Sequence, residues 1–358
     1  MFKQSKLVFA ALFTLTIGVH SAEVDFKDAK ELQPFKGTIL VTGGSGYIGS
    51  HVCYHLKKEG WQPVCFDNFS TGHDWAVKYG PLVKGDLLNP SDIQSAIQKY
   101  QPMAVMHLAS FIQVGESVKD PLKYYTNNVT GMINLLEAMR EWKVPYIIFS
   151  STAATYGNPI YTPIDEKHPC QPINPYGHSK LMIEQMLKDC SQAYGIRSVS
   201  LRYFNAAGAA PEEGLGEAHE PESHLIPLMI EAAQKEKVLK VFGRDYDTRD
   251  GTCLRDYIHI LDLADAHLKA LEYLGKGGAT VSINLGSGTG TTNLEMIQHL
   301  ERLFGVKVPF EYAERRPGDP DSLVSSYDLA KQVIGWKPTR SIDQILKDAW
   351  EWSYRSRH

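Results

Sequence analysis

A tyrosine and a lysine four residues apart, Tyr176 and Lys180, have the types and spacing needed for proton-transfer chemistry. On a helix, residues at this spacing share a face, so the lysine ammonium can approach the ligand that the tyrosine hydroxyl contacts. A free tyrosine has a pKa of about 10, and a neighbouring cation favours its phenolate form closer to neutral pH. The pair therefore indicates a general base that acts on a hydroxyl group.

A cluster of hydroxyl groups, residues 150–152, separates this pair from ordinary Tyr/Lys pairs on a helix surface. The cluster ends an apolar stretch that is typical of a central strand. The carboxyl ends of strands line the ligand crevice of parallel sheets, so we expect Thr152 to hydrogen-bond the substrate oxygen that Tyr176 deprotonates.

A glycine turn near the start of the chain indicates a nucleotide site. Gly43, Gly46 and Gly49 follow the apolar run 38–42 and precede a helical stretch. The first glycine allows a sharp turn, the second lets the backbone approach a pyrophosphate, and the third lets the helix pack on the strand. Asp67 ends the next apolar run and would accept hydrogen bonds from ribose hydroxyls, which favours NAD over NADP.

These residues require a particular arrangement of strands and helices. Apolar runs at 39–42, 62–66, 82–83, 103–107, 144–150 and 197–202 alternate with helical stretches at 91–100, 128–141 and 179–193. This alternation predicts an α/β fold, a Rossmann-like doubly wound parallel sheet. After residue 205 the alternation breaks into segments rich in glycine and proline, which predicts a smaller C-terminal α/β subdomain for the substrate.

Composition excludes several other classes of protein. The 358 residues are 43% hydrophobic and 22% charged, with a net charge of −4, so we expect a globular enzyme that does not bind nucleic acid. Five scattered cysteines suggest no disulfide framework. We expect no metal site: His51, Cys53 and His55 are interpreted as helix-surface and core residues.

The first 22 residues form a separate segment. Lys3 and Lys6 precede an apolar run at 7–19, as in a signal peptide or a short anchor. Any membrane contact is expected only through this segment. Because the dinucleotide has to be available, we expect the catalytic part to face the cytoplasm. The domain hypothesis is a spacer at 23–36, an NAD-binding domain at 37–205 and a substrate subdomain at 206–355, with part of 255–290 returning to the nucleotide domain. The family resemblance described next implies that this subdomain mainly binds a UDP-sugar.

Together these motifs resemble the extended short-chain dehydrogenase/reductase family and, more narrowly, its NAD-dependent UDP-sugar 4-epimerases of galactose metabolism. The resemblance covers about 37–355 and rests on residues 42–51, 114–117, 127–129, 201–205, 250–252, 255–259, 315–316 and 318–319. It implies an isomerase that interconverts UDP-galactose and UDP-glucose through a 4-keto sugar, with hydride passing to bound NAD and back.

The resemblance also implies roles for individual residues. Catalysis would rest on Tyr176, Lys180 and Thr152. The implied NAD-binding residues are Gly43, Gly46, Tyr47, Ile48, Gly49, Asp67, Asn68, Asp86, Leu87, Asn127, Lys180 and Tyr203. The implied UDP-sugar-binding residues are Thr152, Tyr176, Asn205, Leu225, Arg255, Tyr257, Arg316, Asp319 and Leu323.

Three alternatives stay open or are weakened by particular residues. Leu323 is intermediate in size between the large and small residues found at its position in the family, which leaves N-acetylated sugars open as substrates. Because the sugar pocket is poorly read from the sequence, epimerisation of UDP-N-acetylglucosamine or UDP-glucuronate is an alternative. A dehydratase is disfavoured because Ala153 and Ala154 stand where those relatives have an acid pair. A non-catalytic NAD(H) sensor is disfavoured by the intact Tyr176, Lys180 and Thr152.

The resemblance further implies a homodimer formed through helices that include 128–140 and 179–193.

Overall fold

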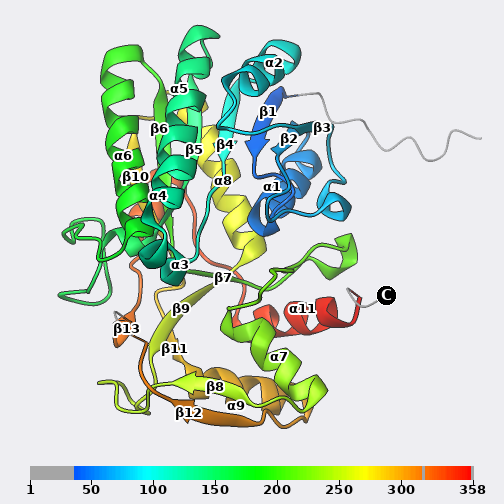
Figure 1. Ribbon diagram of the computed structural model, residues 1–358, viewed down its shortest axis with the longest axis vertical. Coiled ribbons are helices and arrows are strands. Elements are labelled where there is room, and N and C mark those ends of the chain that lie inside the picture. The colour runs from blue at the N-terminus through cyan, green and yellow to red at the C-terminus, as the bar shows by residue number, and fades with distance from the viewer. Residues whose placement is uncertain (1–35, 317–318, 356–358) are drawn as a thin grey trace, which may run out of the picture. The chain divides into compact units, whose positions relative to one another are not determined.

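The computed structural model describes residues 36–316 and 319–355, which form an α/β fold (Figure 1). Seven strands make up its large sheet, all parallel, in the order β10-β6-β5-β4-β1-β2-β3. They are β1 (Thr38–Thr42), β2 (Gln62–Asp67), β3 (Leu82–Lys84), β4 (Ala104–His107), β5 (Tyr146–Thr152), β6 (Arg197–Tyr203) and β10 (Val281–Leu285). The predicted fold class is confirmed. The strand order reverses between β1 and β4, where such sheets bind ligands.

Helices cover both faces of this sheet because its strands are apolar on both sides. In β1, Ile39 and Val41 belong to one hydrophobic cluster and Leu40 belongs to the other. The first cluster packs under α1 (Tyr47–Lys58), α8 (Ile260–Gly275) and α10 (Asp328–Ile334). The second packs under α2 (Pro90–Tyr100), α5 (Gly131–Glu141) and α6 (Pro175–Tyr194).

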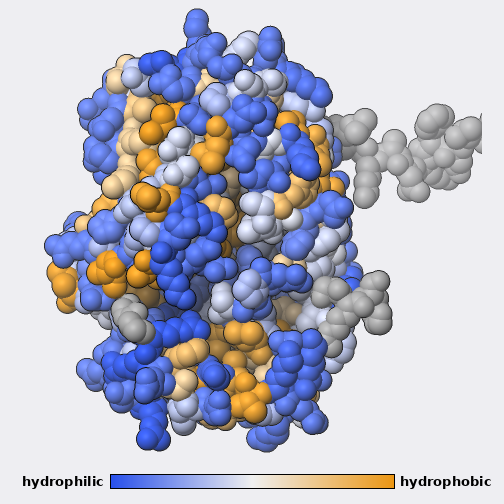
Figure 2. All heavy atoms as spheres, viewed as in Figure 1, coloured by the Kyte–Doolittle hydropathy of each residue, from blue (hydrophilic) through white to orange (hydrophobic). Residues whose placement is uncertain are grey.

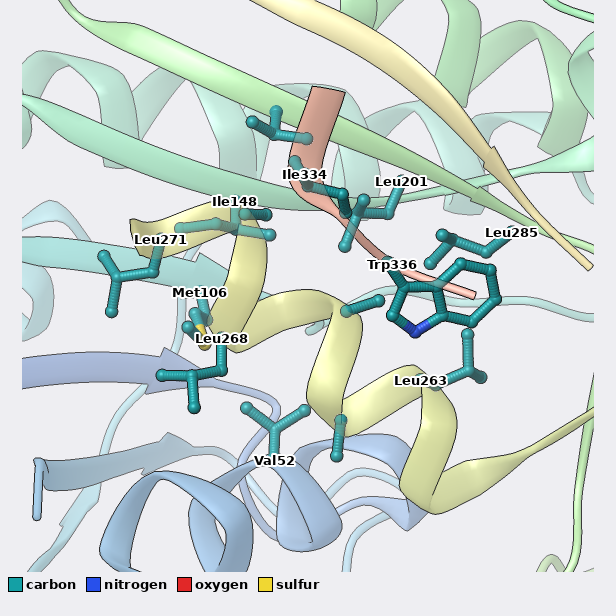
Figure 3. Packing of buried hydrophobic residues seen from close by; sticks show 14 of the residues in the cluster. Val52, Met106, Ile148, Leu201, Leu263, Leu268, Leu271, Leu285, Ile334 and Trp336 are labelled. Carbon is teal, nitrogen blue, oxygen red and sulfur yellow. The ribbon is translucent and has the colours of Figure 1, made fainter. Parts of the chain in front are cut away.

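Helix α8 lies along the centre of the first cluster (Figure 3). Its Leu263, Leu268 and Leu271 are buried together with strand residues such as Leu201. Trp336 is fully buried beside α8, and its indole N–H donates to the carbonyl oxygen of Asp262 at 2.8 Å. Although α8 and β10 come late in the chain, both therefore belong to the large sheet and its covering layer.

Several elements differ in their bounds from those predicted from the sequence, and two of these differences place candidate site residues. Strand β5 continues to Thr152, and α6 begins at Pro175 rather than near Ser179. Asn174 caps α6, since its side-chain oxygen accepts from the N–H of Gly177 at 2.8 Å, and proline suits the first helical position. Tyr176 therefore lies in the first turn of the helix.

The remaining strands form two smaller sheets (Figure 1). One contains β7 (Asn205–Ala207), β9 (Leu254–His259), β11 (Gly290–Thr292) and β13 (Ser322–Leu323), and the other pairs β8 (Leu239–Phe242) with β12 (Phe310–Ala313). A third hydrophobic cluster joins them to α7 (Leu225–Lys235), α9 (Asn293–Phe304) and α11 (Ile342–Arg355). The short elements are η1 (Asp74–Ala76), α3 (Val114–Lys119), α4 (Pro121–Tyr124), η2 (Tyr125–Thr130), η3 (Ala153–Thr155) and η4 (Pro211–Glu213).

Two predictions concern the ends of the chain and its cysteines. Within the described ranges, every helix is too short or too polar to serve as a membrane span. The signal-like segment 1–22 and nearly all of the spacer 23–36 lie outside those ranges. Cys53 and Cys65 are buried, as predicted, in α1 and β2.

Candidate active site

The glycine turn joins β1 to α1 and has little room for side chains. Gly43 has a φ of +72°, and a Cβ at this position would lie 2.6 Å from the backbone nitrogen of Ala109. A Cβ on Gly49 would lie 2.0 Å from the carbonyl oxygen of Gly43, so the third glycine lets the helix approach the turn itself. Gly46 is the N-cap residue of α1, where the first helical N–H groups have no partner within the helix. These N–H groups and the helix dipole suit an anionic ligand.

The polar groups around this turn fit a dinucleotide. Asp67, at the end of β2, accepts hydrogen bonds from the N–H groups of Ser45 (3.0 Å) and Phe69 (2.9 Å). The hydroxyl group of Ser45 is buried, and no partner for it occurs among the described residues. An unsatisfied hydroxyl beside a helix N-terminus is the kind of group that a pyrophosphate oxygen would satisfy.

Three further residues predicted to bind the cofactor, Asn68, Asp86 and Leu87, lie just after the ends of β2 and β3. The side-chain amide of Asn68 donates to Asp86 at 3.1 Å, and Asp86 also accepts from the N–H of Leu88 at 2.8 Å. Leu87 is buried, and its carbonyl oxygen accepts from Asn134 of α5 at 2.9 Å. Asn68 and Asp86 thus meet at one edge of the sheet, near the end of β2 that carries Asp67.

Tyr47 and Ile48 form the first turn of α1. The hydroxyl group of Tyr47 donates to the carbonyl oxygen of Gly208 at 2.6 Å, which ties this turn to the chain just after β7. Ile48 is partly buried against the first hydrophobic cluster. Their side chains therefore fix the start of α1.

The predicted catalytic residues converge where β5 ends and α6 begins. Thr152 ends β5, and its side chain lies close enough to Tyr176 in the first turn of α6 to act on the pKa of the tyrosine hydroxyl. One helical turn later, the ammonium group of Lys180 donates to the carbonyl oxygen of Ser150 at 2.8 Å. Lys180 is 1% exposed, and its Nζ atom lies 5.8 Å from the centroid of the Tyr176 ring.

Burial opposes the charged form of both groups. It raises the pKa of Tyr176 to about 12, although the Thr152 side chain acts in the opposite direction. Burial also lowers the pKa of Lys180 to about 7. The expected phenolate near neutral pH therefore does not follow from the Tyr176/Lys180 pair alone and needs a further positive charge beside the tyrosine.

A buried asparagine that the sequence analysis passed over holds this site together. The Asn128 side chain accepts from the N–H of Phe111 at 3.0 Å and donates to the carbonyl oxygen of Phe111 and to the hydroxyl of Ser179, both at 3.2 Å. Its neighbour Asn127, which was predicted to bind the cofactor, donates to it at 3.0 Å. Both lie in η2, a turn of π-helix, and such turns are frequent at functional sites. Two adjacent asparagines in a helical stretch were the available signal, because asparagine is a poor helix former.

Tyr124 was also missed. It is fully buried, and its ring packs edge-on against Tyr176 with 6.5 Å between the ring centroids. Its hydroxyl group lies 2.8 Å from both the carbonyl oxygen of Gln113 and the carboxylate of Glu116. This contact links α3 and α4 to Tyr176.

Tyr203, predicted to bind the cofactor, ends β6 directly opposite Thr152 in the sheet register. Its hydroxyl group forms a 2.5 Å hydrogen bond with the Nε2 atom of His267 in α8. The residue is 6% exposed, so Tyr203 is buried beside Thr152.

Four of the nine predicted UDP-sugar residues lie on neighbouring strands of the four-stranded sheet. Asn205 of β7 is in register with Tyr257 of β9, and Leu323 of β13 is in register with Arg255 of β9. The surface is hollowed at the level where these strands approach the large sheet (Figure 2). Leu225 starts α7 and packs against the cluster that contains Tyr257.

The two predicted arginines lie in different surroundings. Arg255 is 7% exposed, and its guanidinium group pairs with the carboxylate of Asp319. Arg316 is exposed, and its guanidinium carbon lies 4.0 Å from the centroid of the Phe242 ring. The structure thus brings Arg255 and Asp319 together, whereas Arg316 stacks on an aromatic ring of β8.

Comparisons with known proteins agree with this site. The model of the NAD dependent epimerase/dehydratase family matches residues 39–286. The UDP-glucose 4-epimerase of Rhizobium leguminosarum bv. trifolii is 51% identical over 320 residues, which are 89% of this chain and 98% of that protein. The corresponding protein of Rhizobium meliloti (strain 1021) is 52% identical over 320 residues, which are 88% of this chain and 97% of that protein.

A solved structure gives the same result. The crystal structure of UDP-glucose 4-epimerase from Brucella ovis in complex with NAD aligns with a TM-score of 0.85 at 48% identity, covering 88% of this chain and 97% of that one. The residues matched by the family model include the glycine turn, Thr152, Tyr176 and Lys180. The chain belongs to the NAD-dependent epimerase/dehydratase family.

Proposed function

We propose that this protein is an NAD-dependent isomerase that interconverts UDP-galactose and UDP-glucose, as a UDP-glucose 4-epimerase does. The observation that carries the proposal is the convergence of Thr152, Tyr176 and Lys180 at the carboxyl end of β5, in a chain about half identical to proteins of that name. Fold alone would not distinguish the members of this family, so the proposal rests on these side chains.

The cofactor would lie across the point where the strand order reverses. When bound, NAD would accept a hydride from C4 of the sugar and return it to the opposite face. The glycine turn and Ser45 would hold the pyrophosphate, and Asp67 the adenosine ribose. Asn68, Asp86 and Leu87 would hold the adenine end, and Asn127, Lys180 and Tyr203 the nicotinamide end.

The proton at the sugar 4-hydroxyl would be moved by Tyr176. Its phenolate oxygen takes this proton as C4 becomes a ketone and returns it when the alcohol re-forms. Thr152 hydrogen-bonds the same oxygen and so aligns it with the tyrosine. Lys180 stabilises the phenolate, and its bond to Ser150 fixes its position relative to Thr152. Because both faces of C4 have to be presented, the site must hold the nucleotide firmly and let the sugar turn.

The nucleotide part would be held by the strand residues of the small sheet. Arg255 is preorganised by its ion pair with Asp319, and a guanidinium group can offer two parallel donors to diphosphate oxygens. We assign Asn205, Leu225, Tyr257 and Arg316 to the same ligand. Leu323, in register with Arg255, would bear on the space around the sugar.

The proposal also covers the oligomeric state of the protein and its location in the cell. We propose a homodimer formed through α5 and α6, because both helices carry large apolar side chains that are about half exposed, Ile133 (44%) and Met182 (47%). We also propose that the catalytic part works in the cytoplasm, where NAD and nucleotide sugars are both available.

The test uses the full chain purified without added NAD. UDP-galactose is supplied, and UDP-glucose is detected with a coupled dehydrogenase, with Tyr176→Phe protein as the control. We expect turnover by the unaltered chain and a loss of at least about 100-fold in the variant. Absence of turnover from folded protein that carries NAD would overturn the galactose assignment, and UDP-N-acetylglucosamine and UDP-glucuronate would then be tried.

A further inference from the structure

Four metal-ligating side chains, distinct from the residues assigned above to catalysis and ligand binding, converge in the segment that leads into α7 and directly precedes Leu225. They are Glu217, His219, Glu222 and His224, and one ligand atom from each lies within 4.8 Å of the other three. Donors about 2.1 Å from a zinc ion are about 3.4 Å apart in a tetrahedron, so no pair would need to close by more than about 1.4 Å. We propose that these four residues bind one divalent zinc ion per chain.

The contacts among these side chains favour a shared cation. The Nδ1 atom of His224 lies 2.7 Å from Glu217 and 2.9 Å from Glu222, while the Nδ1 atom of His219 lies 3.0 Å from the same Glu217 oxygen. A single proton on the His224 nitrogen can point well at only one of its two carboxylates. A metal ion at the centre would be bound by both carboxylates and both imidazoles at once.

The chemistry of the four donors suits zinc. Imidazole nitrogens and carboxylate oxygens are ordinary zinc ligands, and two carboxylates balance the charge of a divalent ion. The Glu217 side chain is 8% exposed and that of His224 is 45% exposed. One ligand is therefore sheltered, and another leaves a path for the ion from solvent.

The backbone that carries the first two ligands is held in place by other elements. The indole N–H of Trp352 donates to the carbonyl oxygen of Glu217 at 2.8 Å, and the Nε2 atom of His73 donates to that of Ala218 at 2.7 Å. The N–H groups of Ser223 and His224 donate to the Glu222 carboxylate at 2.7 and 2.8 Å and orient it. Such fixed ligands need little rearrangement to bind a metal.

The position of the site predicts what the ion does. Ala218 and His219 line a small cavity together with Ser45, Gly46 and Tyr47 of the glycine turn. Glu222 and His224 lie at the start of α7, of which His224 is the N-cap residue. The ion would join the segment beside the glycine turn to α7, a structural role that does not depend on the proposed function. It also departs from the sequence expectation that the chain holds no metal.

The test is a zinc titration of the full chain with its NAD, after treatment with a chelator, in competition with a chromophoric zinc indicator. We expect one zinc ion per chain, a dissociation constant below micromolar, and a Tm that rises with zinc. His219→Gln/His224→Gln should weaken zinc binding at least about 100-fold, since even supporting groups near a metal contribute 10- to 100-fold. Circular dichroism checks folding, and Glu222→Gln is the second variant if the double one fails to fold.

The matched control is His299→Gln, which removes a histidine paired with Asp343 at 2.9 Å elsewhere on the chain. It should bind zinc as the unaltered protein does. Absence of stoichiometric binding would overturn the proposal. Equal binding by the double variant would also overturn it, because the zinc would then be adventitious.

Discussion

The ammonium group of Lys180 donates a hydrogen bond to the carbonyl oxygen of Ser150, and the two atoms are 2.8 Å apart. This bond ties the second turn of α6 to the last residues of β5, so Tyr176 and Thr152 are held by two elements joined at a buried point. The bond therefore fixes the position of the Lys180 ammonium group. Burial at this position lowers the pKa of Lys180 to about 7.

Replacing Lys180 by methionine is expected to lower turnover by a factor of about 10² to 10⁴, the usual contribution of a group that assists proton transfer. Methionine fills similar volume but provides no charge for the Tyr176 phenolate. Steady-state kinetics with UDP-galactose check this, with retained NAD measured in the same samples. Undiminished turnover would mean that the lysine takes no part in the proton transfer.

The stability contributed at Lys180 depends on pH in a predictable direction. Burial lowers the pKa of this group from 10.5 to about 7, so between these values the unfolded chain binds more protons than the folded chain. The free energy of unfolding therefore rises with pH over this range. Urea unfolding of ligand-free protein at about pH 7 and about pH 9.5 should show the unaltered chain gaining stability relative to Lys180→Met. A difference between the two proteins that is the same at both pH values would contradict this.

A buried ion pair beneath the site is expected to matter far more than one on the surface. Arg202 of β6 pairs with Glu184 of α6 at 2.5 Å, and their side chains are 5% and 1% exposed. Glu184→Gln leaves the guanidinium charge uncompensated and should lower the free energy of unfolding by about 3–5 kcal/mol.

The control for this change is Glu137→Gln, whose partner Arg140 is exposed on α5, and it should cost less than about 1 kcal/mol. Urea unfolding at one pH compares the two variants. Equal losses in the free energy of unfolding for the two variants would show that burial does not increase the contribution of the Arg202–Glu184 pair to stability.

Two glycines provide a test of the turn geometry. Gly49→Ala would place a methyl group 2.0 Å from the carbonyl oxygen of Gly43, so we expect destabilisation of at least about 1–3 kcal/mol and loss of NAD. Gly275→Ala, at the end of α8, meets no atom within 4 Å and should stabilise the chain by about 0.4–1 kcal/mol. Thermal unfolding and the NAD content of both variants check this. Normal NAD binding by Gly49→Ala would contradict the proposal that the glycine turn and the start of α1 hold the cofactor.

The sugar preference should respond to Leu323. Leu323→Tyr would narrow the space beside Arg255 and disfavour UDP-N-acetylglucosamine relative to UDP-galactose, whereas Leu323→Gly would favour it. A change of this size in a pocket is worth roughly 10- to 200-fold in relative kcat/KM. If the ratio of kcat/KM for the two UDP-sugars were unchanged in both variants, the residue that determines the accepted sugar size would have to lie elsewhere.

Most of the large sheet and the glycine turn were predictable because their signals are local. Six of the seven strands were predicted from short apolar runs, and the turn residues stand next to one another in the chain. Strand β10, which reaches the sheet from the C-terminal half, was not among the predicted strands. The start of α6 was missed by four residues, although Asn174 and Pro175 are an ordinary helix start.

Contacts between distant segments could not be read in the same way. The pairing of Arg255 with Asp319, and of Asn128 with Phe111 and Ser179, depends on how strands and helices meet in space. Burial had a similar effect on the electrostatics. The spacing of Tyr176 and Lys180 predicts a cation that lowers the tyrosine pKa, but it cannot give the depth at which both groups lie.

The most direct test of the central claim follows the hydrogen at C4. UDP-galactose deuterated at this carbon is converted by the full chain in ordinary water without added NAD, and the UDP-glucose formed is analysed by NMR. Hydride transfer to a retained cofactor and back predicts that the deuterium stays at C4 in the product, and that Tyr176→Phe slows its formation. Loss of the deuterium to solvent would contradict the account, because the carbon would then be inverted by proton removal.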